Sequence, residues 1–304
     1  MDHSTDRDKM LRFGAIGVFG RANSGKSTLV NTLVGEKVSI VSARPQTTRK
    51  RILGVLTVGK SQIVFCDTPG LHAVKNRLDA FMDHEIVETV AGLVGALYLV
   101  DCVKPQIEED KGNLERLFSG SKIPVCLLIN KCDLLDPGKV TNILETYKNL
   151  WKFEATFAIS SLSKQNLKKL QSHLLGRLPE GVHAYDSDFF TASPEREIAA
   201  EIIRETMLEQ YFHEIPHSTA VLVEEFKERE NGKTYISANL ILERDSQKKI
   251  VVGKAGEGIK KLGSVSREKL NQILGRDIFL QLWVKVRANW RKNEEWVRRF
   301  GYTK

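Results

Sequence analysis

The sequence is poor in cysteine, and it lacks any long apolar run. Its 304 residues include only four cysteines, without a CxxC pair or a paired Cys/His spacing, so neither a disulfide framework nor a zinc site is indicated. Reduced thiols in a cytosol are expected. The N-terminus is charged from its second residue, which excludes a secretory signal peptide. The longest apolar run spans 11 residues, 90–100, whereas a membrane-spanning helix needs about 20. We interpret this run as a buried core segment.

An excess of positive over negative charge is also missing from most of the chain. Residues 247–304 contain 15 lysines and arginines against 5 acidic residues, a net charge of +10, whereas the whole chain has +8. A basic terminal region predicts a polyanionic partner, and a solvated basic face is the alternative. The ordinary apolar and charged content excludes disorder, collagen and coiled coil, and the length suggests about two domains.

Two differently patterned regions are visible. In residues 12–178, apolar runs without two-residue alternation are separated by amphipathic stretches, which predicts a mostly parallel sheet covered on both faces. A turn at residues 58–61 adds one antiparallel edge strand. The predicted fold is a doubly wound α/β domain. Residues 179–193 have no sustained period and contain proline and glycine, so we place the linker there.

Residues 194–304 form the predicted second domain. Ser193 followed by Pro194 is typical of a helix start, with the proline at the first helical position. Two strands follow, joined by a segment with the hairpin signal Asn231-Gly232. A helix from about Glu257 and a last strand complete the order α-β-β-α-α-β, which predicts a smaller α+β domain.

The segment GRANSGKS matches GxxxxGK[ST] between a predicted strand and a predicted helix. Backbone N–H groups of such a loop surround phosphate oxygens. Lys26 is expected to neutralise the β and γ phosphates, and Ser27 to ligate Mg²⁺. A glycine-rich structural turn is the alternative. The predicted phosphate-binding residues are Gly20, Arg21, Ala22, Asn23, Ser24, Gly25, Lys26, Ser27 and Thr28.

A second phosphate motif, DTPG, follows the apolar run IVFC, at the strand end where α/β sheets bind ligands. Asp67 is expected to hold the magnesium shell and the N–H of Gly70 to meet the γ phosphate; an exposed turn is the alternative. Leu71 stands where many GTPases have a glutamine that orients water, so we predict unaided turnover below roughly 1 s⁻¹. The residues assigned to this motif are Asp67, Thr68, Pro69, Gly70 and Leu71.

The polar segment 44–51 lies between the two phosphate motifs. Thr48, or as a weaker alternative Thr47, is expected to reach Mg²⁺ only while the γ phosphate is present, which makes the segment a nucleotide-dependent switch. A basic surface loop is the other interpretation. The predicted catalytic residues are Lys26, Thr48 and Gly70, and the predicted metal ligands are Ser27, Thr48 and Asp67.

The motif NKCD ends another apolar run, at residues 130–133. Asp133 is expected to accept hydrogen bonds from guanine N1–H and the exocyclic amine, which adenine lacks, so discrimination can reach roughly 10⁴. Asn130 would tether the loop and base, and Lys131 would lie along the ring. The residues assigned to the base are Asn130, Lys131, Cys132 and Asp133, with Ser160, Ser161 and Leu162 on a further loop.

These motifs, in this order, resemble the small-GTPase domain of the translation-factor class. Nearly the whole chain after the first ten residues resembles the Era family of bacterial ribosome-assembly GTPases. In the first half, the resemblance is carried by the segments PQTTRKRILGV and DTPGLH. In the second half, it is carried by PEREIAAEIIRE, VEEF, LERDSQKKIVVGKAGEGIKKLG and FLQLWVKVRANWR. The resemblance implies a GTP-hydrolysing P-loop domain that uses GTP, GDP and Mg²⁺. It also implies a type II KH domain that binds the 3′ end of small-subunit ribosomal RNA and assists 30S subunit biogenesis.

The resemblance further implies a cytoplasmic protein with a peripheral inner-membrane fraction, and we expect a monomer. Asn23 matches a position that coordinates K⁺ in some relatives. Ala22, Ser24 and Ser161 depart from the residues usual in the family, which are proline, valine and alanine. Because backbone groups do most of the work in these loops, we expect the same chemistry.

The segment Gly253-Lys254-Ala255-Gly256 fits the GxxG loop of a KH fold. The glycines let the backbone approach the sugar–phosphate chain, and Lys254 adds charge. A helix-start turn is the alternative for so short a pattern. On the last strand, Phe279 and Trp283 are candidates for base stacking, although core packing is the favoured interpretation.

Three functions compete at this stage. The leading one is a GTP-hydrolysing switch whose nucleotide state changes how the basic domain engages RNA. The second is an RNA scaffold in which GTP is a structural ligand; the set Lys26, Ser27 and Asp67 argues against it. The third is a signalling GTPase whose basic tail binds anionic lipid, for which a GxxG loop would be unnecessary.

Overall fold

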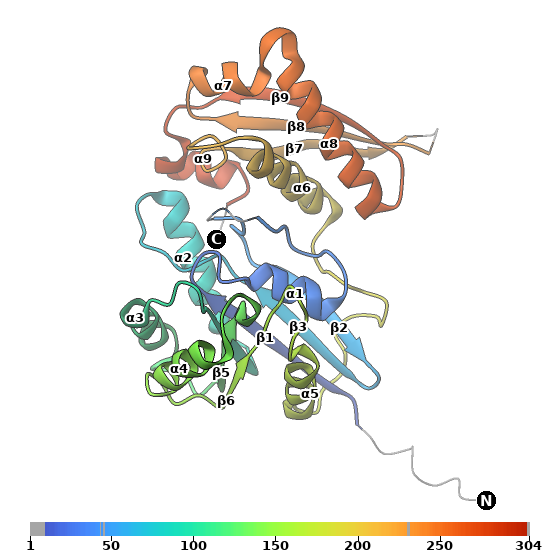
Figure 1. Cartoon of the computed structure of the whole chain (residues 1–304). Coiled ribbons are helices and arrows are strands. Elements are labelled where there is room, and N and C mark those ends of the chain that lie inside the picture. Colours follow the sequence, from blue (N-terminus) through green and yellow to red (C-terminus); the bar gives the residue numbers. More distant parts are fainter. Residues whose placement is uncertain (1–9, 43, 45, 230–231, 303–304) are drawn as a thin grey trace, which may run out of the picture. The chain divides into compact units, whose positions relative to one another are not determined.

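The computed structural model describes residues 10–42, 44, 46–229 and 232–302 (Figure 1). The chain divides into two compact units. The first contains residues 10–39, 48–72 and 84–192, and the second contains the described residues of 40–47, 73–83 and 193–302. Two short segments from the first half of the chain therefore belong to the second unit.

The first unit is built on a six-stranded sheet with the order β2-β3-β1-β4-β5-β6. β2 runs antiparallel to β3, and the other neighbours are parallel, which confirms the predicted mostly parallel sheet with one antiparallel edge strand. The strands are β1 (Arg12–Gly20), β2 (Ile52–Val58), β3 (Ser61–Asp67), β4 (Gly95–Asp101), β5 (Val125–Asn130) and β6 (Ala155–Ala158).

Helices cover both faces of this sheet. They are α1 (Lys26–Val34), α2 (Arg77–Val90), α3 (Ile107–Phe118), α4 (Pro137–Lys148) and α5 (Leu167–Arg177). Adjacent residues of β4 point to opposite faces: Tyr98 packs in a buried cluster with Leu114 of α3, and Leu97 packs in another with Leu29 of α1 and Leu170 of α5. The doubly wound α/β fold is thus confirmed.

The segment predicted as a linker, 179–193, lies along the first unit for most of its length. Gln62 of β3 accepts a hydrogen bond from the N–H of Ala184 at 2.9 Å and donates one to the carbonyl of Tyr185 at 2.8 Å. The carbonyl of Phe190 accepts from Val55 of β2 at 2.8 Å. These bonds satisfy polar groups of β2 and β3, the antiparallel pair at one edge of the sheet.

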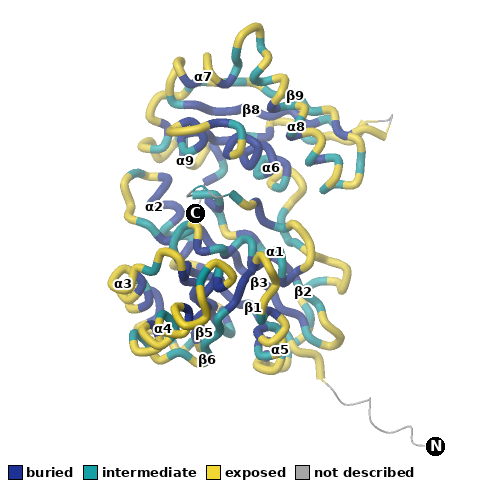
Figure 2. Tube along the Cα trace, viewed as in Figure 1, coloured by how far each residue is buried: buried dark blue, intermediate teal, exposed yellow. Residues whose placement is uncertain are grey.

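The second unit has a three-stranded sheet, β7-β8-β9, in which β7 and β8 are antiparallel and β8 and β9 are parallel. β8 is buried almost throughout (Figure 2). The predicted order α-β-β-α-α-β is confirmed, followed by an additional short helix. The elements are α6 (Glu195–Gln210), β7 (Ala220–Glu228), β8 (Thr234–Leu242), α7 (Asp245–Val252), α8 (Glu257–Leu274), β9 (Ile278–Val286) and α9 (Glu294–Arg299).

Two local details of this unit differ from expectation. Pro194 is the N-cap of α6, not its first helical residue, so the helix begins one position later. Phe279 and Trp283 are 50% and 53% exposed, so their assignment to the core was wrong. Their neighbours on β9 with the opposite orientation, such as Leu280 and Leu282, pack against the buried cluster under α6 and α8. Among the described residues, no helix has both the length and the apolar character of a membrane span.

Candidate functional site

The phosphate loop connects β1 to α1, as its pattern predicted. Gly25 has φ of 100°, and a Cβ at this position would lie 2.3 Å from Nδ2 of Asn130. A side chain would therefore collide with a residue of the predicted base-binding motif, and the left-handed backbone would be strained as well. The loop can follow this path because the position is glycine.

Lys26 is the first residue of α1 and is almost fully buried. Its Nζ donates hydrogen bonds to the carbonyl oxygens of Gly20 and Arg21, both at 3.0 Å. Burial lowers the pKa of Lys26 to about 8, an effect that Asp67 opposes and Arg21 reinforces. The ammonium group is thus held against the loop by main-chain oxygens.

The three predicted metal ligands converge. Ser27 Oγ donates to Asp67 Oδ2 at 2.6 Å and lies 2.9 Å from Thr48 Oγ1, which is 3.4 Å from the same carboxylate oxygen. Asp67 is fully buried, and burial raises the pKa of its carboxyl. Its Oδ1 is buried without a hydrogen-bond partner in the described part of the chain. Oxygen ligands with one unsatisfied carboxylate oxygen fit the preference of Mg²⁺.

The structure distinguishes between the two switch threonines. Thr47 Oγ1 donates to the carbonyl of Arg44 at 2.6 Å, whereas Thr48 is buried beside Ser27 and Asp67. The geometry therefore favours Thr48 over Thr47 as a metal ligand.

The DTPG motif follows β3 and lies against the phosphate loop. A Cβ on Gly70 would be 2.6 Å from Cα of Ala22, so the two loops can approach only because residue 70 is glycine. Thr68 Oγ1 donates to the carbonyl of Val18 at 2.7 Å, which holds the motif to β1. The side chain of Leu71 is buried in the core, and its N–H donates to the carbonyl of Gly20 at 3.1 Å. Leu71 thus packs structurally instead of presenting a polar group for water.

The predicted base-binding motif begins where β5 ends. Asn130 Nδ2 donates to the carbonyl of Ser24 at 2.8 Å, and its Oδ1 accepts from the N–H and Oγ of Ser161, both at 3.0 Å. Lys131 Nζ forms an ion pair with Asp101 Oδ2 at 2.6 Å. Asp133 is exposed in a short 3₁₀ turn. Asn130 therefore joins the phosphate loop to the loop after β6.

The remaining members of this group have unequal surroundings. Ser160 is buried, and its Oγ accepts from the N–H of Ser163 at 3.0 Å. The N–H of Cys132 donates to the carbonyl of Ile159 at 3.1 Å. Leu162 is 81% exposed. The two loops are hydrogen-bonded to each other, and Leu162 is free to contact a ligand or solvent.

The GxxG segment lies between α7 and α8. Lys254 and Ala255 are exposed, and Ala255 has φ of 50°, which is uncommon for a residue with a side chain. The exposed lysines 248, 249, 260 and 261 lie on the two flanking helices. An exposed, sharply turned loop between basic helices has the geometry for contact with a sugar–phosphate backbone.

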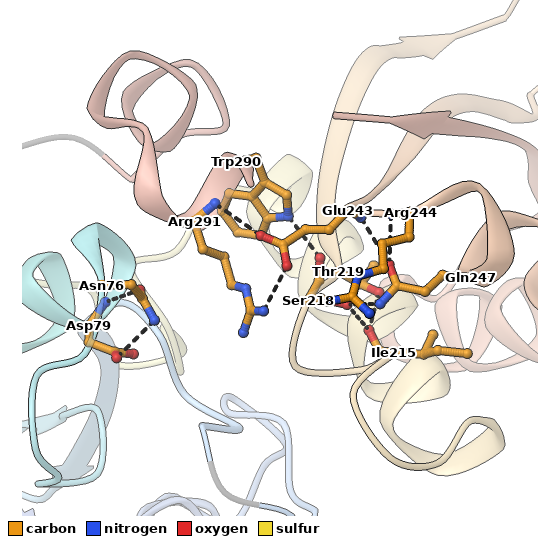
Figure 3. Close-up of polar contacts among 10 residues, drawn as sticks. All are labelled: Asn76, Asp79, Ile215, Ser218, Thr219, Glu243, Arg244, Gln247, Trp290 and Arg291. Carbon is orange, nitrogen blue, oxygen red and sulfur yellow. Dashed lines mark hydrogen bonds and ion pairs between the residues drawn. The ribbon is translucent and has the colours of Figure 1, made fainter. Parts of the chain in front are cut away.

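A polar network fixes the start of α7 (Figure 3). Gln247 Oε1 accepts from the N–H groups of Glu243 and Arg244 at 3.0 and 3.1 Å, and its Nε2 donates to Ser218 Oγ at 2.9 Å. The indole of Trp290 donates to the carbonyl of Ser218 at 2.7 Å. The helix that leads to Gly253 is thereby held to the segment before β7.

Comparisons with known proteins show the family of the chain. Residues 15–131 match the model for the 50S ribosome-binding GTPase family, and residues 214–291 match the KH domain. "GTPase Era" of Geobacter sp. strain M21 is 42% identical over 97% of this chain and 99% of the relative. The chain belongs to the Era family of GTPases. The corresponding protein of Heliobacterium modesticaldum is 39% identical over 96% of this chain and 97% of its own.

Two solved Era structures are similar over both units. A substituted Era of Aquifex aeolicus bound to GDP and AlF₄⁻ matches with a TM-score of 0.93 at 34% identity, covering 97% of this chain and 100% of that one. An Era structure with MgGDPNP and nucleotides 1506–1542 of 16S ribosomal RNA matches with a TM-score of 0.91 and the same identity and coverage. Membership of this GTPase family makes the chain a GTP-hydrolysing enzyme with a KH domain.

Sequence reasoning missed the acidic partners of the site. Asp101 pairs with Lys131, and Asp110 of α3 is 3.3 Å from Nε of Arg21 in the phosphate loop. Neither aspartate lies in a recognisable motif. Asp101 directly follows the apolar residues of β4, so its position at a strand end could have indicated a role in the site. No feature of the sequence indicates such a role for Asp110.

Proposed function

We propose that this chain is a slow GTP-driven switch that binds the 3′ end of small-subunit ribosomal RNA and assists 30S subunit biogenesis. In this proposal residues 12–178 bind and hydrolyse GTP, residues 179–193 connect, and residues 194–304 bind RNA. The convergence of Ser27, Thr48 and Asp67 beside Lys26 is the observation that carries the nucleotide site. The RNA target is supported by the Era relative whose solved structure holds a 16S fragment.

Each site residue has its own role toward the nucleotide in this proposal. Lys26 neutralises the β and γ phosphates, the N–H of Gly70 donates to the γ phosphate, and Thr48 orders the switch segment. Ser27, Thr48 and Asp67 hold Mg²⁺, which when bound offsets the charge of the phosphates. Asp133 selects guanine. The buried Leu71 supplies no polar group for the attacking water, so turnover by the protein alone stays below roughly 1 s⁻¹.

The nucleotide site is tested by Lys26→Ala with Lys139→Ala as the matched control. Lys139 is a largely exposed lysine of the same unit, paired with Asp136. GTP turnover and calorimetric GTP binding are expected to be lost in the first variant and kept in the second. Full turnover by Lys26→Ala would refute the assignment of the site.

The RNA site is tested by replacing Lys254 and Ala255 together with aspartate. The probe is an oligonucleotide with the 16S sequence 1506–1542, the fragment bound by the solved relative. Because two carboxylates would repel the sugar–phosphate chain, RNA binding should be lost while GTP binding is unchanged. Unchanged RNA affinity would reject the assignment of the loop 253–256 as an RNA contact, and binding to anionic vesicles in place of RNA would favour a membrane role.

Three finer parts of the proposal rest on family resemblance and on charge. Asn23 coordinates K⁺ at the phosphate loop, which a comparison of turnover in K⁺ and Na⁺ tests. The protein is cytoplasmic with a peripheral inner-membrane fraction, which the basic C-terminal region supports and vesicle sedimentation tests. It acts as a monomer, which sedimentation velocity tests.

A further inference from the structure

A buried carboxylate lies behind the phosphate loop. The Asp110 side chain, on α3, is 1% exposed and accepts three hydrogen bonds. Tyr98 of β4 donates to Oδ1 at 2.8 Å, Tyr147 of α4 donates to Oδ2 at 2.7 Å, and Arg21 Nε donates to Oδ1 at 3.3 Å. A buried carboxylate is tolerable only with such partners, so removing any one of them is expected to lower stability.

The two tyrosines are fixed as donors. Burial and the proximity of Asp110 raise the pKa values of Tyr98 and Tyr147, so both hydroxyls keep their protons at physiological pH. The Tyr147 hydroxyl also accepts from the N–H of Gln106, the residue before α3, at 3.1 Å. The carboxylate is therefore held in place by a strand and two helices.

Arg21 carries this constraint into the phosphate loop. Its guanidinium donates to the carbonyl of Lys104 at 2.5 Å as well as to Asp110, so both ends of the fork are engaged. The main-chain carbonyl of the same residue accepts from Lys26 Nζ at 3.0 Å, and its backbone pairs with that of Leu71. One residue thus joins the buried carboxylate to the phosphate-binding lysine.

We propose that Asp110 is a positioning residue for GTP hydrolysis, acting through Arg21 on Lys26. The guanidinium fixes the backbone of Arg21, and the carbonyl of Arg21 fixes the ammonium of Lys26. The Arg21 side chain therefore faces the protein interior and sets loop geometry, while the phosphates are met by backbone N–H groups and Lys26. This inference rests on the proposed nucleotide site, and the experiment separates failure of one from failure of the other.

The test measures kcat and KM for GTP in Arg21→Ala, Asp110→Asn and the double variant. A displaced lysine weakens its interaction with the phosphates in the transition state, so each single variant should lose about tenfold or more in kcat. Because both changes break one connection, the double variant should be no slower than the slower single variant. Arg21→Lys keeps one charged contact to Asp110 and should recover part of the rate.

Two comparators separate positioning from stability. Tyr98→Phe removes a buried hydroxyl but leaves the Arg21–Asp110 pair, so it should lower the melting temperature with less than threefold loss of kcat. Arg177→Ala breaks the ion pair with Glu154 at 3.1 Å in the same unit and should leave kcat unchanged. If Asp110→Asn does not fold, Arg21→Ala and Arg21→Lys decide the question, since the Arg21 side chain is 18% exposed.

Three outcomes would overturn the inference: kcat within twofold of wild type in Arg21→Ala, multiplicative losses in the double variant, or no recovery by Arg21→Lys. In each of these cases Lys26→Ala would still be inactive if the nucleotide site is correct. Retention of turnover by Lys26→Ala would instead refute the site itself.

Discussion

The guanidinium of Arg204, on α6, donates hydrogen bonds to the main-chain carbonyls of Gln46 and Thr47. Arg204 is 1% exposed and also pairs with Glu201. Its neighbour Glu205 accepts from the N–H of Val41 at 3.1 Å. The first helix of the second unit therefore holds the chain immediately before Thr48.

This contact predicts that Arg204→Ala loosens the switch segment. Without the guanidinium, the carbonyl of Thr47 loses a charged donor, and Thr48 is less often in place beside Ser27 and Asp67. We expect roughly fivefold slower GTP turnover and a stability loss of about 1–3 kcal/mol. Steady-state kinetics and urea denaturation measure these effects.

The matched control is Arg276→Ala. Arg276 is an arginine of the same unit that pairs with Glu195 and Glu228. The Arg276→Ala variant should keep GTP turnover within twofold of wild type. Equal turnover in wild type and Arg204→Ala would show that α6 does not control the switch segment.

A second prediction concerns base selection by Asp133. Asparagine at this position offers an N–H in place of one carboxylate oxygen, which matches the 2-carbonyl of xanthine better than the 2-amino group of guanine. Asp133→Asn should therefore bind GTP at least about a hundredfold more weakly and gain affinity for XTP. Competition with a fluorescent nucleotide measures both, and Asp136→Asn, on an exposed pair with Lys139, serves as the control. Undiminished GTP binding would remove Asp133 from the site.

A third prediction follows from the exposed aromatic residues of β9. Tyr235 stacks on Phe279 with ring centroids 5.9 Å apart, and Arg229 lies over both rings. Trp283 is half-exposed on the same strand. If RNA bases stack here, Trp283→Ala should weaken binding of single-stranded RNA about tenfold. Val182→Ala, an exposed apolar residue of the first unit, is the control. Equal RNA affinity in both variants would rule out stacking on Trp283.

A fourth prediction concerns the thiols. All four cysteines are buried and free, and burial raises the pKa of Cys66 and Cys102 to about 11 and that of Cys126 to about 12. A higher thiol pKa means less thiolate at a given pH, on the order of one part in a thousand at pH 8 for a pKa of 11. Native protein should react slowly with Ellman's reagent at pH 8, and guanidinium-unfolded protein should show four fast thiols. A fast thiol in the native state would contradict the burial of these groups.

Much of the nucleotide site was predictable because its residues sit in short motifs at strand ends. The strands that precede GRANSGKS, DTPG and NKCD need not be known in detail, since parallel strands bring their carboxyl ends to one edge. Asn130, Lys26 and Asp67 were predicted on this basis. Their hydrogen-bond partners were found only in the structure.

What escaped prediction depends on contacts between distant segments. Asp110 and Arg204 look like ordinary helix-surface charges in the sequence, and only packing shows that they are buried. The orientation of Trp283 was misjudged for a related reason: alternation along β9 defines two faces but does not say which one helices cover. The division of the chain was likewise obscured, because residues 73–83 and the described residues of 40–47 fold with the second unit.

The carboxamide of Asn130 holds both Ser24 and Ser161. A single side chain thus links the loop predicted to bind the triphosphate to the loop predicted to contact the base. A shift of either loop is therefore expected to move the other through the hydrogen bonds of this amide. A substitution of Asn130 is therefore expected to affect base recognition and phosphate binding together.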